Sequence, residues 1–399
     1  MLTFLDRLTI ARYTLILILI SILFSPPITT VLEFFLYALI LLSKELQTKI
    51  KESISQPLAI TSILFYTVII ASSINPLVTW SESLSSVWAW RKILLLPIAF
   101  SIFDDNQWKN KACIAFIVVT SICAVLSFLS SITEFPIHKY PIGITIRNHA
   151  TQGIIFSIAA YTSAILLLFN TTKQKKIKTL LLTTSIILLI ENVIYITPGR
   201  SGYLALIVSS ISFITIYIHK TKKYRLPLLL GILIPVLLLT SSNVQQRVNQ
   251  GLEEATTYNT NKQATSMGIR MVLWRNTIDL IKEHPFIGYG TGGFEKAYQA
   301  KIKNEPEWKH YITHDPHNQF LKITTEQGMA GIISFITLIF SSCFQKPKYI
   351  FFTLGITVLL TWCLNSLFSS HFSTFSEGRF IFLWLGIMMS NQKHKKTLG

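Results

Sequence analysis

Long apolar runs recur along nearly the whole of this 399-residue chain and constrain its fold more than any other feature. A helix that crosses a bilayer needs about 20 predominantly apolar residues, and about twelve runs here approach that length. Charged residues make up only 14% of the chain, whereas a soluble domain carries about 25%. The sequence therefore predicts an all-α polytopic membrane protein with about twelve transmembrane helices. The predicted spans are 9–25, 28–43, 57–75, 84–103, 112–131, 149–169, 179–197, 201–219, 226–242, 319–344, 349–367 and 376–391.

The runs divide the chain into three predicted parts. Residues 1–242 hold helices one to nine, residues 243–318 form a polar segment, and residues 319–399 hold helices ten to twelve and a tail. Within the polar segment, residues 270–282 have helical periodicity with apolar side chains along one stripe. We expect this helix to lie on the membrane surface with Trp274 at the interface.

The basic clusters in the short loops all fall on the side that holds both predicted termini. By the positive-inside rule this side is the cytoplasm, so the polar segment is expected on the opposite, outer side of the membrane. This distribution explains much of the formal net charge of +17 through contacts with membrane lipids, and nucleic acid is not expected as a partner. The first apolar run has no small-residue cleavage site, so no cleavable signal peptide is expected. The basic clusters lie at 44–51, 109–111, 173–178, 220–225, 346–348 and 393–396.

Several other basic residues lie near the predicted outer ends of spans or in the polar segment. A charge at the centre of a span costs roughly 2.5–3.5 kcal/mol on insertion scales, so a negative partner or a function is expected. Arg379 has Glu377 nearby, which favours a local ion pair. Arg147 and Arg200 have no carboxylate neighbour in sequence and are predicted anion ligands, because guanidinium forms paired hydrogen bonds to phosphate. For Arg91, ion pairing and function both remain open.

Two features of the polar segment have competing interpretations. The glycine-rich run 288–294 could cradle phosphate through backbone N–H groups, but a plain turn is favoured because no known phosphate-loop pattern surrounds it. His310, His314 and His317 have a helical spacing that could suit zinc, yet Pro316 would break such a helix. No metal and no cofactor are therefore expected. Asn318 can cap the next helix, which leaves His317 at the outer membrane face as a candidate proton acceptor.

One motif resembles the signature of the O-antigen ligase family. His317-Asn318 is followed by nine residues to Gly328, then by two residues and Gly331. Upstream residues also resemble that family's approach to the signature: Arg270, Trp274, His284-Pro285, Gly288, Gly290 and Phe294.

The resemblance implies a metal-independent inverting glycosyltransferase with a C-type membrane fold. Ligases of this family transfer a glycan from undecaprenyl diphosphate to lipid A-core at the periplasmic face. The resemblance implies that His317 is the catalytic base and that Arg200 and Arg270 bind the diphosphate. Arg147 and Arg91 join them as diphosphate ligands on the ground of their depth. Candidate acceptor or loop contacts are His314, Asn318, Trp274 and Gly290.

Three alternatives remain open at this point. An O-antigen polymerase or a protein O-oligosaccharyltransferase would share the signature and differ in the acceptor. The short segment after the last predicted span favours the ligase. A flippase of lipid-linked sugar would also need arginines near the membrane, but it would make no covalent bond, and the two halves of this chain show no internal repeat.

Overall fold

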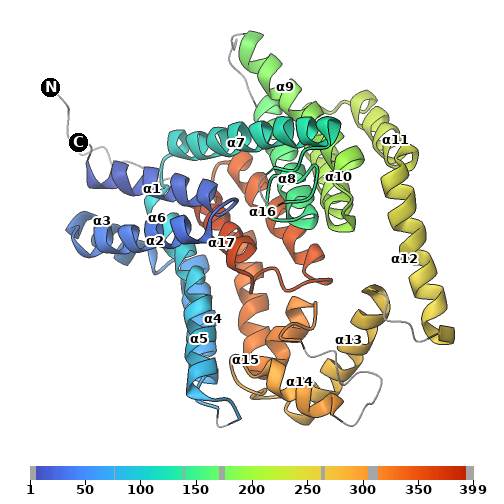
Figure 1. Ribbon diagram of the computed structural model, residues 1–399. Coiled ribbons are helices and arrows are strands. Elements are labelled where there is room, and N and C mark those ends of the chain that lie inside the picture. The colour runs from blue at the N-terminus through green and yellow to red at the C-terminus, as the bar shows by residue number, and fades with distance from the viewer. Residues whose placement is uncertain are drawn as a thin grey trace.

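The protein is built from helices (Figure 1). The computed structural model describes residues 6–391 except 76, 138–139, 170–175, 262–265 and 304–312, and describes only the backbone of 252–261 and 266. Across these ranges no strand occurs, so the predicted all-α class is confirmed.

The first part of the chain consists of short helices followed by one long helix of 28 residues. Sequence signals explain several helix starts: Asp6 and Ser25 cap the first two helices, and Thr79 forms a capping box with Glu82. The elements are α1 (Arg7–Ser21), α2 (Pro26–Leu41), α3 (Lys44–Ser53), α4 (Pro57–Ser72), α5 (Trp80–Trp90), η1 (Arg91–Leu94), α6 (Leu95–Ile102) and α7 (Asn106–Thr133).

Two glycines bring the central helices together. A Cβ atom on Gly153 would lie only 2.8 Å from the Cα of Gly202, so only glycine allows this close backbone approach. Gly199 likewise lies against the carbonyl of His149, which places the first turn of α10 beside the first turn of α8. The elements here are α8 (His149–Leu168), α9 (Lys176–Glu191), η2 (Asn192–Ile196), α10 (Arg200–Thr221), α11 (Arg225–Thr240) and α12 (Ser242–Asn261).

The last part of the chain combines a small helical lobe with three core helices. Leu273, Leu280, Phe294 and Tyr298 form a separate apolar cluster that joins α13 to α14, and these helices lie below the main body in Figure 1. Leu273 and Leu280 form the buried face of α13, whereas Ile278 is 43% exposed. The position of this helix on the membrane surface stays a prediction. The elements are α13 (Ser266–Glu283), α14 (Phe294–Ile302), α15 (Gln319–Ser341), η3 (Ser342–Phe344), α16 (Tyr349–Asn365) and α17 (Phe375–Met389).

Several helices are long and apolar enough to cross a membrane. Among the described residues there are five, or as many as seven if each of two bent helix pairs is counted as one span. The chain is therefore a multi-pass membrane protein. The twelve-span topology and the periplasmic placement of residues 243–318 stay predictions. One predicted span, 84–103, is divided into α5, η1 and α6, with Arg91 and Lys92 at the break.

A break in α15 explains why the signature contains a glycine at position 328. Gly328 has φ 61° and ψ −156°, a conformation that is essentially restricted to glycine. The break frees the carbonyl groups of Thr325 and Glu326, which accept hydrogen bonds from the N–H groups of Tyr289 and Gly290 at 2.8 Å each. The glycine-rich run therefore docks on the broken helix.

Substituting Gly328 with alanine is expected to destabilise the protein. A Cβ atom there would lie 2.2 Å from the carbonyl oxygen of Phe286, and the strained backbone alone costs about 1–3 kcal/mol. The thermal unfolding midpoint of the purified protein in detergent should fall by several degrees. The matched control is Gly231→Ala in α11, where a Cβ would meet nothing within 4 Å, and its midpoint should not fall. Equal midpoints for Gly328→Ala and wild type would contradict this account of the break.

Candidate active site

The loop before α15 presents His317. Asn318 caps α15 as predicted, because its side-chain oxygen accepts the N–H groups of Phe320 at 3.0 Å and Leu321 at 3.1 Å. His317 has φ 54°, in the left-handed region that residues other than glycine rarely adopt. Backbone strain of this kind is concentrated at functional sites.

Neighbouring elements hold this loop in place. The indole N–H of Trp274 on α13 donates to the carbonyl of Pro316 at 3.1 Å, and Lys322 on α15 donates to the carbonyl of His314 at 3.1 Å. Trp274 thus holds the loop through this hydrogen bond. Its position at the membrane interface stays a prediction. The side chain of His314 is exposed. The loop is therefore anchored through backbone carbonyls that precede His317.

Asp315 is the carboxylate nearest to the His317 ring among the described residues. Its Oδ1 accepts the backbone N–H of His317 at 2.9 Å, and its Oδ2 lies 3.9 Å from Nδ1 of the ring. Burial lowers the pKa of His317, the positive charge of Arg270 lowers it further, and Asp315 opposes both by raising it. The imidazole is consequently neutral near pH 7 and able to accept a proton.

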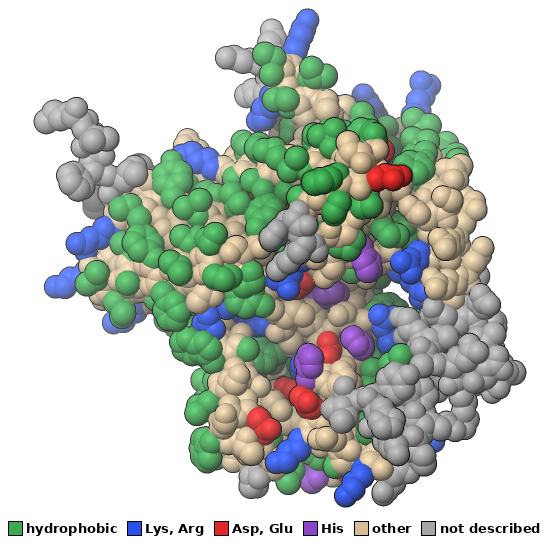
Figure 2. Space-filling model, in the orientation of Figure 1, with side chains coloured by type: hydrophobic (Ala, Val, Ile, Leu, Met, Phe, Trp, Pro, Cys, Tyr) green, Lys and Arg blue, Asp and Glu red, His purple; other side chains and the backbone are tan. Residues whose placement is uncertain are grey.

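A charged cavity of about 470 Å³ opens beside this loop. Arg200 from α10, Arg247 from α12 and Arg270 from α13 line it, together with His149. In Figure 2, histidine, lysine and arginine side chains gather near the centre of the visible face, in the region between α10 and α13. Sequence reasoning identified Arg200 and Arg270, and the structure brings both to one cavity.

The start of α10 adds to the positive character of this cavity. Its N-cap, Gly199, has no side chain that could accept the first N–H groups, and Gly199, Arg200 and Ser201 all line the cavity. The N-terminus of a helix carries a partial positive charge and favours anions. Arginine forks and a helix terminus are together suited to bind phosphate groups.

Arg270 and Phe368 connect the charged cavity to His317. Arg270 lines the cavity and also acts electrostatically on the imidazole. Phe368 lines the cavity and packs against Trp274, with ring centroids 6.1 Å apart. A cationic cavity and a neutral imidazole therefore lie next to each other.

Sequence reasoning missed Arg247 and His149. Arg247 lies in the polar segment like Arg270, so the same criterion of a basic residue outside the cytoplasmic loops could have identified it. His149 directly follows Asn148, the N-cap of α8, and nothing local in the sequence marks it as a site residue.

The other two arginines predicted to bind diphosphate do not line this cavity. Arg91 is buried beside Glu33 at 3.3 Å, with its guanidinium 4.4 Å from the ring centroid of Trp88. Arg147 donates to the hydroxyl of Ser376 on α17. The roles of Arg91 and Arg147 as diphosphate ligands stay predictions. The ion pair with Glu33 is an alternative explanation for the buried charge of Arg91.

The expected pairing of Arg379 with Glu377 is wrong. Arg379 donates instead to both carboxylate oxygens of Glu33 on α2, a fully buried residue. Glu377 accepts hydrogen bonds from Thr151 and Thr374 at 2.6 Å each. Proximity in sequence suggested the wrong carboxylate because the correct one comes from a distant helix.

The plain-turn interpretation of residues 288–294 is confirmed. The N–H groups of Tyr289 and Gly290 are used by α15, and that of Thr291 donates to the carbonyl of Ser72 at 3.2 Å, so they are not directed at a ligand. A Cβ atom on Gly290 would lie only 2.7 Å from the Cβ of Asn75, so close packing of this turn requires glycine at position 290. Within the ranges that the structure describes, no group of three His, Cys, Asp or Glu side chains could hold a metal ion. His310 lies outside the described residues.

The fold and the site define a helical multi-pass membrane protein with a cationic cavity beside a neutral histidine. Residues 183–336 match the family described as O-antigen ligase. An uncharacterized protein of Haemophilus influenzae is 29% identical over 50% of this chain and 51% of its own length. A Rickettsia conorii protein, provisionally named a polysaccharide ligase, is 24% identical over 62% of this chain and 58% of its own length. The chain thus spans little more than half the length of these relatives.

Proposed function

We propose that the protein is a glycosyltransferase of the polysaccharide ligase or polymerase type. In its specific form, it transfers a glycan from undecaprenyl diphosphate to lipid A-core, with inversion, at the periplasmic face of the inner membrane. The observation that carries the proposal is the meeting of Arg200, Arg247 and Arg270 at one cavity beside the His317 loop. The match of residues 183–336 to the O-antigen ligase family supports it.

The charged cavity suits the head of a lipid diphosphate. Each guanidinium can donate two parallel hydrogen bonds to phosphate oxygens. Their fixed positive charge would stabilise the negative charge that grows on the departing diphosphate. Arg200 and Arg270 carry this role in the proposal, and Arg247 adds a third positive charge on another helix.

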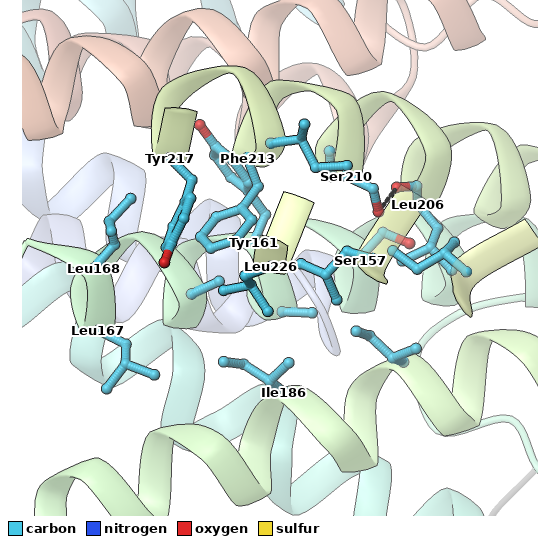
Figure 3. A pocket seen from close by; sticks show the side chains of 17 residues that line it. Ser157, Tyr161, Leu167, Leu168, Ile186, Leu206, Ser210, Phe213, Tyr217 and Leu226 are labelled. Carbon is cyan, nitrogen blue, oxygen red and sulfur yellow. Dashed lines mark hydrogen bonds between the residues drawn. The ribbon is translucent and has the colours of Figure 1, made fainter. Parts of the chain in front are cut away.

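An apolar cavity of about 300 Å³ suits part of the lipid tail. Its lining side chains come from α8, α9, α10 and α11 and face a common space, as Tyr161, Phe213 and Leu226 illustrate (Figure 3). On α10, Arg200 lines the charged cavity, and Leu206 through Tyr217 contribute to the apolar one. The two cavities therefore follow one helix, an arrangement that fits an amphiphile with an anionic head and an isoprenoid chain.

The reaction requires a base but no redox step. Nε2 of His317 takes the proton from the acceptor hydroxyl as that oxygen bonds to the anomeric carbon. The bond from this carbon to the diphosphate oxygen breaks on the opposite face, and its electrons leave with the diphosphate. General base catalysis of this kind is worth about 10²–10⁴-fold in rate.

Purified protein incubated with lipid diphosphate-linked glycan and candidate acceptors tests the proposal. The expected product carries a new glycosidic bond of inverted configuration at the donor carbon. A lipid A-core, glycan or serine acceptor would distinguish a ligase, a polymerase and a protein glycosylating enzyme. Translocation of the lipid-linked glycan with no new bond would overturn the proposal in favour of a flippase.

Transfer is expected to continue in the presence of EDTA. Arginines would supply the positive charge that many phosphate-transferring enzymes take from a divalent ion. Initial rates with excess EDTA and with added Mg²⁺ should agree within about twofold. A loss of more than tenfold in EDTA that Mg²⁺ restores would contradict metal-independent transfer.

A further inference from the structure

We propose that Asp315, held in place by Ser370, is a positioning residue that orients the His317 ring and stabilises its protonated form during transfer. This inference rests on the proposed function, because it assigns a partner to the proposed base. The supporting geometry is the position of the Asp315 carboxylate between the buried Ser370 hydroxyl and the His317 imidazole.

The two oxygens of Asp315 have different partners. Oδ1 accepts the hydroxyl of Ser370 at 2.5 Å and the backbone N–H of His317 at 2.9 Å. Oδ2 is thereby turned toward Nδ1 of His317, 3.9 Å away. This separation is an ion-pair distance, at which the carboxylate can stabilise the protonated ring. A carboxylate on one ring nitrogen leaves the other nitrogen free to accept a proton.

Ser370 is a rigid anchor for this carboxylate. It is only 1% exposed and lies in the turn between α16 and α17. Gln319 at the start of α15 fastens the same turn, since its amide nitrogen donates to the Ser373 hydroxyl at 2.9 Å and its amide oxygen accepts the Ser373 N–H at 3.0 Å. The buried Lys92 donates to the carbonyl of Thr374 at 2.6 Å. Asp315 is therefore anchored to the core of the protein.

The charges around the imidazole make a negative partner necessary. Arg270 from α13, Lys322 from α15 and His314 from the same loop all oppose protonation of His317. Asp315 is the one group among the described residues acting on the ring that favours it. Since the base must become an imidazolium in the transition state, loss of the Asp315 charge would raise the barrier.

Asp315→Asn separates this role from a purely structural one. The amide oxygen of asparagine can still accept the N–H of His317 and the hydroxyl of Ser370, so the turn is kept while the charge is removed. We expect kcat to fall about tenfold with little change in the KM for the lipid-linked donor. The acid limb of the pH–rate profile should also move to lower pH, because removing a nearby negative charge lowers the pKa of His317.

Two further variants sharpen the test. Ser370→Ala should lower kcat by a smaller factor of about threefold, and the double variant should lose little more than Asp315→Asn alone, because both act through one carboxylate. The matched control is Asp279→Asn on α13, whose carboxylate pairs only with the exposed Lys282 in the described structure and which should keep wild-type kinetics.

The outcomes distinguish this inference from the proposed function. If Asp315→Asn keeps the wild-type kcat and pH profile while His317→Ala is inactive, Asp315 has only a structural role and the inference is overturned. If His317→Ala itself retains full transfer activity, the assignment of His317 as the base fails, and this inference fails with it. If the wild-type protein forms no new glycosidic bond, the proposed function fails. A lower kcat together with the shifted acid limb would support the positioning role.

Discussion

His317→Ala is expected to lower the rate of glycan transfer by at least about 100-fold, because general base catalysis typically contributes 10²–10⁴-fold. The acceptor hydroxyl would then have to attack the anomeric carbon without a group to take its proton. Binding of the lipid-linked donor should change little, since the arginines that line the charged cavity are untouched. Initial rates at saturating donor, measured with purified protein, give the comparison.

The left-handed backbone of His317 requires a second variant. Alanine in this conformation carries backbone strain, whereas asparagine tolerates it. His317→Asn should therefore remain folded and be as inactive as His317→Ala. The matched control is His219→Ala, which replaces an exposed histidine near the end of α10. Transfer within twofold of wild type in both His317 variants would exclude the base assignment.

Much of the helical architecture could be predicted from apolar runs. Each run contains a helix in the structure because a chain surrounded by hydrocarbon must satisfy its backbone hydrogen bonds internally. The spacing of the signature located His317, the departure of Arg200 from the charge pattern marked it as an anion ligand, and the resemblance to the ligase family identified Arg270. These predictions depend on local sequence or on the positions of charged residues along the chain.

The partners of the buried charges could not be predicted in the same way. Glu33 lies 58 residues from Arg91 and 346 residues from Arg379, yet it contacts both. A buried carboxylate needs such partners because an unpaired buried charge is costly. The sequence alone gave no means of choosing between Glu33 and the nearby Glu377, and the choice was made by helix packing.

The break in α15 was also beyond sequence reasoning. The signature marked Gly328 without saying why a glycine stands there, and the glycine-rich run 288–294 suggested two unrelated uses. The structure joins the two features, since the carbonyls freed at the break accept the N–H groups of that run. The run that resembled a phosphate-binding loop is thus a structural connection from α13 to α14 that is hydrogen-bonded to α15.

Arg200→Ala is expected to lower kcat for transfer by about 100-fold, the usual cost of removing one donor that stabilises charge in a transition state. Arg200 heads α10 at the wall of the charged cavity, where the departing diphosphate would gain negative charge. Arg200→Lys keeps the charge but loses the planar fork, so its kcat should fall by about tenfold. The same order of effects is expected at Arg270, and the fall should be larger in kcat than in the affinity for the intact donor.

Arginines outside the cavity are the matched controls for this series. Arg225 at the start of α11 is the control position for Arg200, and Arg275 on α13 is the control position for Arg270. Both side chains are exposed. Their alanine and lysine variants should transfer glycan at rates within twofold of wild type. If Arg200→Lys were as active as wild type, a diffuse positive field would suffice and paired hydrogen bonds to phosphate would be excluded. If Arg225→Ala were as impaired as Arg200→Ala, the loss would reflect overall charge, and the charged cavity would no longer mark the donor site.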